Sequence, residues 1–424
     1  MNKHLLMVAL LATGGILGAS AQRDNRLHET GVVSVVNNDT ADVAHVEKTF
    51  KSVAPVSPKE NGLPRFAIVG KDRQFYVGIG AQFLGEAVYD FGNNVGSPTL
   101  FTPSAFTPAT PGNGSGLGFG WQTSSIYANF VAMPGSDNQV GLFFKANFLG
   151  NNNSFNVYHF YAKYRGLTVG YTTSLFSDGA AEPMTIDFEG PNGYPYTTLF
   201  TAYWTQNFNK NWSGAIGIDA PATSLTTNEY TSAVKARTPS IPLYVQYAWA
   251  GGNSHVRLSG IVRPMQYRDT RNGRNHGLAG MGVQLSGMSA VAGPLSVQFN
   301  AAYGRGIGSY IQDDEGLGLD AVAVGNDGDM KMVKTLGVTG GLNCAITSRL
   351  SSNVVYSHVT NWLPDGADVA AGKYKAGDYV AANLIYNVNK FVSAGVEYDY
   401  GLRKSVDGSK IHVNRIQAQI AVTF

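Results

Sequence analysis

The clearest alternation of apolar and polar side chains lies at the end of the chain, over residues 411–424. Every second residue counted back from the end is apolar: Phe424, Val422, Ile420, Ala418 and Ile416. The residues between them are Thr423, Ala421, Gln419, Gln417 and Arg415. Since successive side chains of a strand point to opposite faces, the pattern predicts a strand with one apolar and one polar face. Strands that face lipid on one side and a polar lumen on the other have this pattern.

The same period of two recurs from residue 74 onward, in sixteen runs separated by connections that are alternately short and long. The runs are 74–89, 122–133, 139–149, 155–165, 167–176, 197–207, 212–219, 241–250, 254–267, 277–289, 294–306, 331–346, 350–361, 376–388, 391–402 and 410–424. The longest connections include 91–121, 177–196, 307–329 and 362–375. Single-chain bacterial outer-membrane barrels have an even number of strands, short periplasmic turns and long extracellular loops. The predicted fold class is therefore all-β, a transmembrane antiparallel β-barrel of about 16 strands.

A soluble β-propeller or a two-sheet sandwich is the alternative for a chain with this many strands. A propeller predicts sequence repeats of blade size, and such repeats are not found. Neither soluble fold explains the lipid-like outer faces of the predicted strands.

Composition supports a membrane barrel. Charged residues make up only 14% of the chain, against about a quarter in soluble proteins, whereas Gly (51), Tyr (22) and Phe (21) are abundant. Beyond the amino terminus there is no run of about 20 apolar residues, so a closed barrel is the remaining way to cross a bilayer. The net charge of +2 gives no indication of nucleic-acid binding. The single cysteine, Cys344, excludes an intramolecular disulfide and is interpreted as a packing residue.

The amino terminus has the pattern of a targeting segment. Lys3 and His4 precede an apolar core over 5–17, and Ala19-Ser20-Ala21 is a small-residue cleavage signal. Residues 1–21 are therefore predicted to be a signal peptide. Residues 22–70 lack the alternation and are predicted to be a periplasmic leader with little structure of its own, followed by the barrel over 71–424.

Alternation also sorts the charged side chains of the strands. A charge that faced lipid near the bilayer centre would cost about 2–4 kcal/mol for Arg or Lys, so charges are expected to face the lumen. Tyr158 alternates with His159 and is predicted to face outward. The predicted pore-lining residues are Lys145, His159, Lys163, Arg257, Arg263, Glu397 and Arg415.

The lumen charges have two interpretations. Each can be a solvated or mutually paired wall residue, and Arg415 with Glu397 is expected to form such a pair. Arg257 and Arg263 lie in phase on one strand and are better candidates for drawing anions through the pore. Guanidinium groups match carboxylates with paired donors, and rings of Arg or Lys favour anions.

The segment 177–196 combines turn residues with four acidic side chains, Asp178, Glu182, Asp187 and Glu189. It is interpreted as a constriction loop that folds into the channel, and the alternative is an ordinary extracellular loop.

Several stretches resemble the DcaP-like trimeric porins of Gram-negative outer membranes. Residues 164–193 contain G-L-T-V-G-Y-T-T-S-L-F-S-D followed by T-I-D-F-E-G-P-N-G. Asp219-Ala220-Pro221, the stretch 255–263 and the ending from 395 to 424 extend the resemblance over about 120–424. It implies a homotrimer of sixteen-stranded barrels that passes small, often anionic, solutes such as dicarboxylates, with Arg257, Arg263 and Arg415 in the lumen.

The chain departs from that family at two places. Members often carry an arginine soon after the G-P-N-G element, where this chain has Tyr194, Tyr196 and Thr197. Residues 22–62 show no heptad pattern that would correspond to the family's amino-terminal coiled coil.

Other chemistry finds little support. His159, His255, His358 and His412 lie on separate predicted strands, and no hydrolase elbow, zinc-protease motif or Cys/His cluster is present. We therefore expect no enzyme, no catalytic residue, no cofactor and no metal site. The acidic stretch 313–329 has two interpretations, a calcium-binding loop or a solvated loop.

The predicted function is that of an outer-membrane porin for passive diffusion of small hydrophilic solutes, with a preference for anionic, dicarboxylate-like ones. The alternative is a non-conducting surface barrel that acts as an adhesin or structural antigen. The expected partners are the lipid bilayer, lipopolysaccharide, small solutes and two further copies of the chain, with no nucleic acid. The expected location is the outer membrane of a Gram-negative bacterium.

Overall fold

The computed structural model describes residues 34–35, 40–59, 63–64, 66–70 and 72–424. The predicted signal peptide, 1–21, lies outside the described residues.

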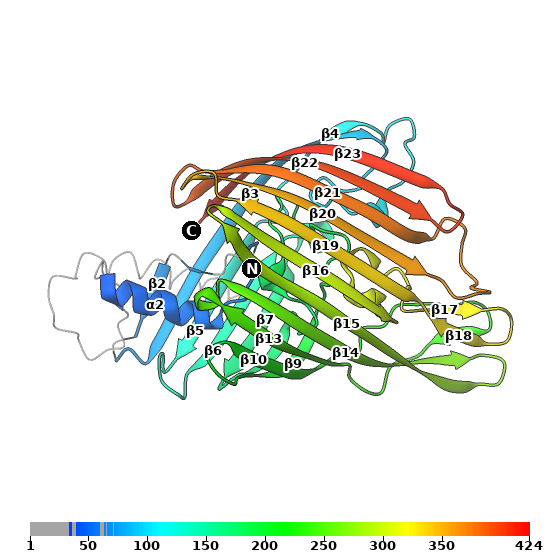
Figure 1. Ribbon diagram of the computed structural model, residues 1–424, viewed down its shortest axis with the longest axis horizontal. Coiled ribbons are helices and arrows are strands. Elements are labelled where there is room, and N and C mark those ends of the chain that lie inside the picture. Colours follow the sequence, from blue (N-terminus) through cyan, green and yellow to red (C-terminus); the bar gives the residue numbers. More distant parts are fainter. Residues whose placement is uncertain (1–33, 36–39, 60–62, 65, 71) are drawn as a thin grey trace.

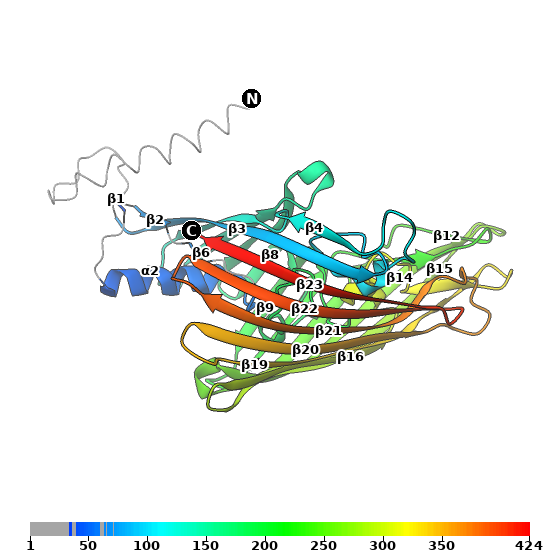
Figure 2. The same cartoon turned by 90° about the horizontal axis from the view of Figure 1, so that it is seen from above.

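Sixteen antiparallel strands form a closed barrel, and each corresponds to one predicted run (Figures 1 and 2). They are β3 (Phe75–Gly92), β5 (Ser125–Ala132), β6 (Val140–Asn147), β7 (Asn156–Tyr164), β8 (Leu167–Thr173), β9 (Thr198–Asn207), β10 (Trp212–Asp219), β13 (Ile241–Trp249), β14 (Ser254–Asp269), β15 (Arg274–Ala292), β16 (Leu295–Arg305), β19 (Lys334–Cys344), β20 (Leu350–Trp362), β21 (Tyr374–Asn387), β22 (Val392–Ser405) and β23 (Lys410–Thr423). The last strand closes the barrel by pairing with the first, from Val413 opposite Gly92 to Thr423 opposite Gln82. The predicted all-β barrel is confirmed.

Short strands and single-turn helices accompany the sixteen strands of the barrel wall. The short strands are β1 (Ser34–Val35), β2 (Phe66–Val69), β4 (Gly116–Gly120), β11 (Leu225–Thr226), β12 (Thr231–Ala233), β17 (Ala321–Val324) and β18 (Asp329–Met332). The single-turn 3-10 helices are η1 (Pro103–Ala105), η2 (Asn151–Asn153), η3 (Gly179–Ala181), η4 (Ala250–Gly252), η5 (Gly308–Tyr310) and η6 (Gln312–Asp314). β11, β17 and β18 form a separate three-stranded sheet within the long loops.

The two ends of the barrel differ. The carboxyl terminus and the helix α2 (Thr40–Val53) lie at the end where the strands are joined by short turns, and the long loops lie at the other (Figure 1). By the rule for outer-membrane barrels, the short-turn end is periplasmic and the long-loop end is extracellular.

The two faces of the wall have opposite chemistry. On the closing strands, Val396, Tyr398, Ile416 and Ile420 are about half exposed on the outer face, whereas Glu397, Asp399, Arg415 and Gln417 are almost completely buried on the inner face. Only a closed barrel satisfies strand backbone groups inside lipid. Among the described residues, no helix is long and apolar enough to cross a membrane.

Inserted segments fill much of the lumen. From the long-loop end, residues of 95–106 pack on β20, β21 and β23, and residues of 307–319 pack on β14, β16 and β20. The sequence did not indicate that either loop folds inward. The core of the protein is therefore inside the barrel, between its wall and its own loops.

The leader contains regular structure that the sequence analysis did not predict. Helix α2 lies at the short-turn end, where Val46, Phe50 and Val53 pack in one buried cluster with inner-wall residues of β3, β5, β6 and β7. β2 pairs with β3 over Phe66–Val69. The expectation of little structure over 22–70 is therefore wrong for the described part of this segment.

Candidate constriction site in the barrel lumen

The loop that joins β8 to β9, residues 177–196, lies inside the barrel. Twelve of its side chains are buried: Ser177, Asp178, Ala181, Glu182, Pro183, Thr185, Ile186, Asp187, Pro191, Asn192, Tyr194 and Pro195. It packs against the wall opposite its own strands, because Asn300 of β16 donates to the carbonyl of Ala181 at 3.1 Å and Ser357 of β20 accepts from the backbone N–H of Gly193 at 2.9 Å. A loop held in this way narrows the lumen.

Glu397 of β22 holds the middle of this loop. Its carboxylate accepts the backbone N–H groups of Ile186 at 2.8 Å and Asp187 at 2.6 Å. Asn383 and Gln417, from the two neighbouring strands, donate to the same carboxylate at 2.7 and 2.8 Å. Glu397 therefore positions the loop, and its oxygens are already occupied by protein donors.

Asp178 holds the beginning of the loop. Its carboxylate lies 2.8 Å from His255 Nε2, 2.6 Å from Ser286 Oγ and 3.5 Å from Arg257 Nη1. Burial disfavours the charged form of Asp178, but Arg257 and the hydrogen bond with His255 outweigh burial and lower the pKa to about 2. Arg257 also donates to Gln246 at 2.7 and 2.8 Å, so this arginine mainly tethers the loop.

Protein donors bind the carboxylates of Asp187 and Glu189. Asp187 accepts from the N–H of Phe101 at 3.1 Å and of Gly190 at 2.8 Å, and from the hydroxyl of Tyr379 at 3.2 Å. Glu189 accepts from the hydroxyl of Thr102. Burial raises the pKa of Asp187, and it raises the pKa of Glu189 to about 8. Glu189 is therefore mostly uncharged at neutral pH.

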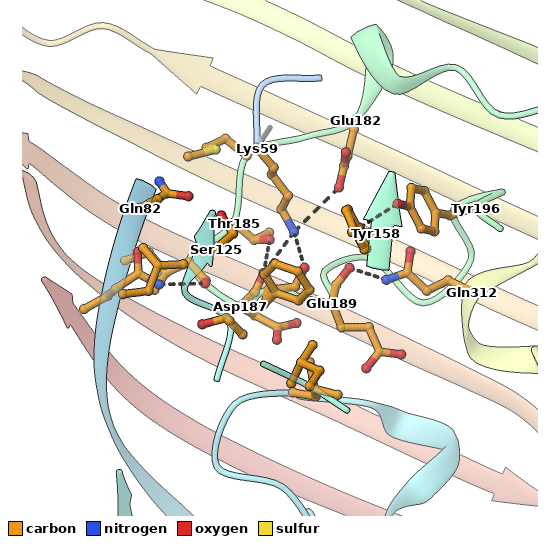
Figure 3. Close-up of a pocket in the computed structure, with 18 of the residues that line it drawn as sticks. Lys59, Gln82, Ser125, Tyr158, Glu182, Thr185, Asp187, Glu189, Tyr196 and Gln312 are labelled. Carbon is orange, nitrogen blue, oxygen red and sulfur yellow. Dashed lines mark hydrogen bonds and ion pairs between the residues drawn. The ribbon is translucent and has the colours of Figure 1, made fainter. Parts of the chain in front are cut away.

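Beside the loop is a cavity of about 290 Å³. It is bounded by the loop, β3, β5, β6, β7, β23 and the end of the leader (Figure 3). Its polar lining includes Lys59, Gln82, Thr123, Ser125, Lys145, Tyr158, Glu182, Thr185, Asp187, Glu189, Tyr196, Gln312, Glu315 and Gln419. The site thus has two ammonium groups, several carboxylates and hydroxyl and amide groups around a space that admits water.

The predicted basic residues of β6 and β7 lie on the inner wall. Lys145 lines the cavity, with its ammonium 5.4 Å from the ring centre of Tyr158. His159 is completely buried, with Nδ1 2.9 Å from the hydroxyl of Thr172. Lys163 lies near the short-turn end, where its ammonium donates to the carbonyl of Ser52 in the last turn of α2 at 3.4 Å. Of these three, Lys145 alone lines the cavity.

Two of the predicted arginines have no surface for a solute. Arg263 is completely buried and binds Asp320 at 2.7 and 3.2 Å as well as the carbonyls of Gly306 and Ala222. Arg415 is also completely buried and binds Asp90 of β3 at 2.7 and 3.0 Å. The predicted pair between Arg415 and Glu397 is wrong, because the partner across the closing seam is Asp90.

The acidic residues of the long loop 306–333 have separate partners. Asp320 binds Arg263, Asp313 accepts from the hydroxyl of Tyr374 at 2.5 Å, and Asp314 accepts from Asn361 at 2.9 Å. Among the residues that the structure describes, no three His, Cys, Asp or Glu side chains are grouped so as to hold a metal ion.

Sequence reasoning missed two kinds of site residue. Tyr158 points into the cavity instead of outward, because a β-bulge between β6 and β7 shifts the register between Lys145 and Ala146 and puts two consecutive residues on the inner face. Its hydroxyl bonds that of Tyr196 at 2.5 Å. Lys59 comes from the leader. In the sequence it is a lone lysine in a proline-spaced segment, and nothing there indicates that it lies in the lumen.

A closed sixteen-stranded barrel with an apolar outer belt, a polar inner face and a loop folded into its lumen has the architecture of outer-membrane porins. Comparison with solved structures agrees. The outer-membrane channel DcaP of Acinetobacter baumannii superimposes with a TM-score of 0.73, at 21% identity, over 84% of this chain and 99% of that one. The resemblance to DcaP-like porins expected from the sequence is confirmed at the level of the fold.

Two less similar outer-membrane proteins share the same architecture. The anion-selective porin from Comamonas acidovorans matches with a TM-score of 0.53 at 10% identity, over 82% of this chain and 100% of that one. The trimer form of the Vibrio cholerae outer-membrane protein OmpT matches with a TM-score of 0.51 at 9% identity, over 82% and 99%. No protein-family model matches the chain, and no curated protein matches its sequence.

Proposed function

We propose that this protein is a passive porin of a Gram-negative outer membrane that admits small hydrophilic solutes down their gradients. The observation that carries the proposal is the cavity of about 290 Å³ between the barrel wall and the inserted loop 177–196, whose lining includes charged, hydroxyl and amide side chains. An inner wall built from polar side chains and closed against lipid provides a path for solutes that cannot cross hydrocarbon. The fold shared with the outer-membrane channel DcaP and with the anion-selective porin from Comamonas acidovorans supports the same proposal.

We further propose a mild preference for anions, including dicarboxylates. Arg263 and Arg415 do not support this preference, because their guanidinium groups are buried on protein carboxylates. The support comes from the cavity lining, where Lys59 and Lys145 contribute positive charge while Glu189 is mostly protonated at neutral pH. Basic side chains at a narrow point favour anions.

We also propose that three copies assemble in the outer membrane, with lipid and lipopolysaccharide around the barrels. The apolar outer belt and the trimer form of OmpT, a protein of similar fold, support this arrangement. The alternative of a non-conducting adhesin is less well supported, because the proteins of similar fold include a channel and a porin.

The test is a planar-bilayer recording of the purified protein at neutral pH under a salt gradient. We expect stepwise currents in groups of three with a reversal potential that favours anions. Liposome swelling with succinate, compared with a neutral sugar of similar size, then measures dicarboxylate entry. A folded, heat-modifiable barrel that gives neither current nor swelling would refute the porin proposal, and a cation-favouring reversal potential would refute only the anion preference.

A further inference from the structure

The end of the leader reaches the cavity beside the inserted loop. From helix α2 the chain continues through 54–59 into the barrel, where Ser57 donates to Glu182 of the inserted loop at 2.8 Å. The ammonium of Lys59 donates to the carbonyls of Asp187 at 2.9 Å and Phe188 at 3.3 Å, and lies 3.7 Å from the carboxylate of Glu182 (Figure 3). The leader therefore contacts the inserted loop at its most acidic stretch.

The barrel is shaped to receive this segment. On β6, a Cβ added to Gly141 would lie only 2.4 Å from a methyl group of Val53, so any larger residue would displace the end of α2. In the inserted loop, a Cβ added to Gly179 would lie 2.4 Å from the carbonyl oxygen of Val56. Wall and loop thus both leave room for the leader backbone, which indicates that the leader occupies the lumen as a structural element.

The helix fixes the position of the segment above it. Phe50 and Val53 are each 1% exposed and pack with Tyr127, Phe143 and Tyr161 of the inner wall. The hydroxyl of Tyr161 donates to the carbonyl of Val53 at 2.7 Å. Burying these two apolar side chains against the wall removes them from water and stabilises the helix in this position.

We propose that the leader reaches the conduction path through Lys59, which lines the cavity and sets part of its ion selectivity. This inference rests on the proposed porin function and makes part of the constriction come from a segment that precedes the barrel strands. In that arrangement, Lys59 offsets the loop carboxylates at the cavity, with its side chain 12% exposed. Without the charge of Lys59, Lys145 is the remaining ammonium group of the cavity lining, and it faces the carboxylates of the loop. Cations then pass more readily.

The first experiment tests the location without requiring current. In a Cys344→Ser background, Val53→Cys and Gly141→Cys place two Cβ atoms about as close as a disulfide needs, since the Cβ–Cβ separation is 3.2 Å and disulfides span about 3.5–4.5 Å. We expect a disulfide in the membrane-inserted barrel, read as a thiol-reversible mobility shift. A folded, heat-modifiable barrel without the disulfide would overturn the inference.

The second experiment tests the role of Lys59 by reversal potential at low salt. A unit charge about 4 Å from a passing ion is worth roughly 1 kcal/mol in water, or about fivefold in permeability for each ion. Since this charge favours anions and disfavours cations, Lys59→Gln should lower the anion-to-cation permeability ratio about 25-fold. Lys59→Arg should retain the ratio. The matched control is Lys51→Gln, which removes an exposed lysine of the same leader and should change nothing.

The outcomes separate the two proposals. A conducting wild-type protein whose Lys59→Gln variant keeps the wild-type ratio would overturn the role of Lys59 and leave the porin intact. A silent wild-type protein that forms the disulfide would refute conduction, and with it the selectivity role of Lys59.

Discussion

Replacing Arg263 by Ala should destabilise the barrel without changing its ion selectivity. Arg263 and Asp320 are both completely buried, and their side chains meet at 2.7 Å. Removing one partner of such a pair costs about 3–5 kcal/mol because the other charge stays buried without compensation. In the variant, Asp320 still accepts hydrogen bonds from the backbone N–H groups of Ser309 and Ser224 at 2.9 Å. We therefore expect a loss of about 3 kcal/mol in the free energy of unfolding, at the lower end of this range.

The assay is urea unfolding of the reconstituted protein, followed by the heat-modifiable gel shift, with reversal potential measured on the same preparation. The matched control is Arg271→Ala, because the Arg271 side chain is 42% exposed and its contacts with Asp269 and Asp327 are 3.3 and 3.7 Å. Exposed pairs of this kind contribute little to stability. An Arg263→Ala barrel with wild-type stability and a reversal potential shifted toward cations would refute the reasoning. It would show that Arg263 acts on ions in the pore.

Three further predictions concern the inserted loop and its cavity. Asp178→Asn should increase current fluctuations in single-channel records, because it removes the charge that binds Arg257 and His255. The pKa of Asp178 is lowered to about 2. The charge of Asp178 therefore stabilises the fold at pH values above its usual pKa of 3.8, and this stabilisation is lost as the pH falls through about 2. Raising the pH from 6 to 9.5 should shift the reversal potential toward cations, because burial raises the pKa of Glu189 to about 8 and its charge appears across this range; a constant potential would exclude Glu189 from the ion path. Lys145→Gln should lower anion permeability several-fold at low salt, and unchanged succinate swelling would contradict the proposed part of Lys145 in the anion preference.

The wall of the barrel was predictable because strand alternation is a local property. Each of the sixteen runs corresponds to one strand, and the lumen-facing side of Arg257 and Glu397 followed from their apolar neighbours. Because a charge in lipid is costly at each outward position, the lipid-facing side of each strand can be identified from its apolar residues. Where a bulge interrupts the period, as at Tyr158, the same reasoning assigns the wrong face.

The pairing of lumen charges was not predictable, because it depends on contacts between segments distant in sequence. Arg415 is bound by Asp90, 325 residues earlier, instead of by Glu397 on the adjacent strand. Arg263 is bound by Asp320, from a loop with no sequence signal for folding inward. A buried guanidinium needs partners at hydrogen-bonding distance, and only the folded barrel decides which carboxylates reach it.

The sequence by itself determined a closed membrane barrel, its approximate strand boundaries and the residues that face its lumen, since these follow from a period of two and the exclusion of charge from lipid. Only the tertiary structure decided which segments fill that lumen. Loop 177–196 was a candidate from composition, whereas the inward fold of 95–106, of 307–319 and of the leader to Lys59 depends on shape and partners across the barrel. Alternation records which side of a strand meets lipid, but it contains no information about what a loop meets after it leaves the strand.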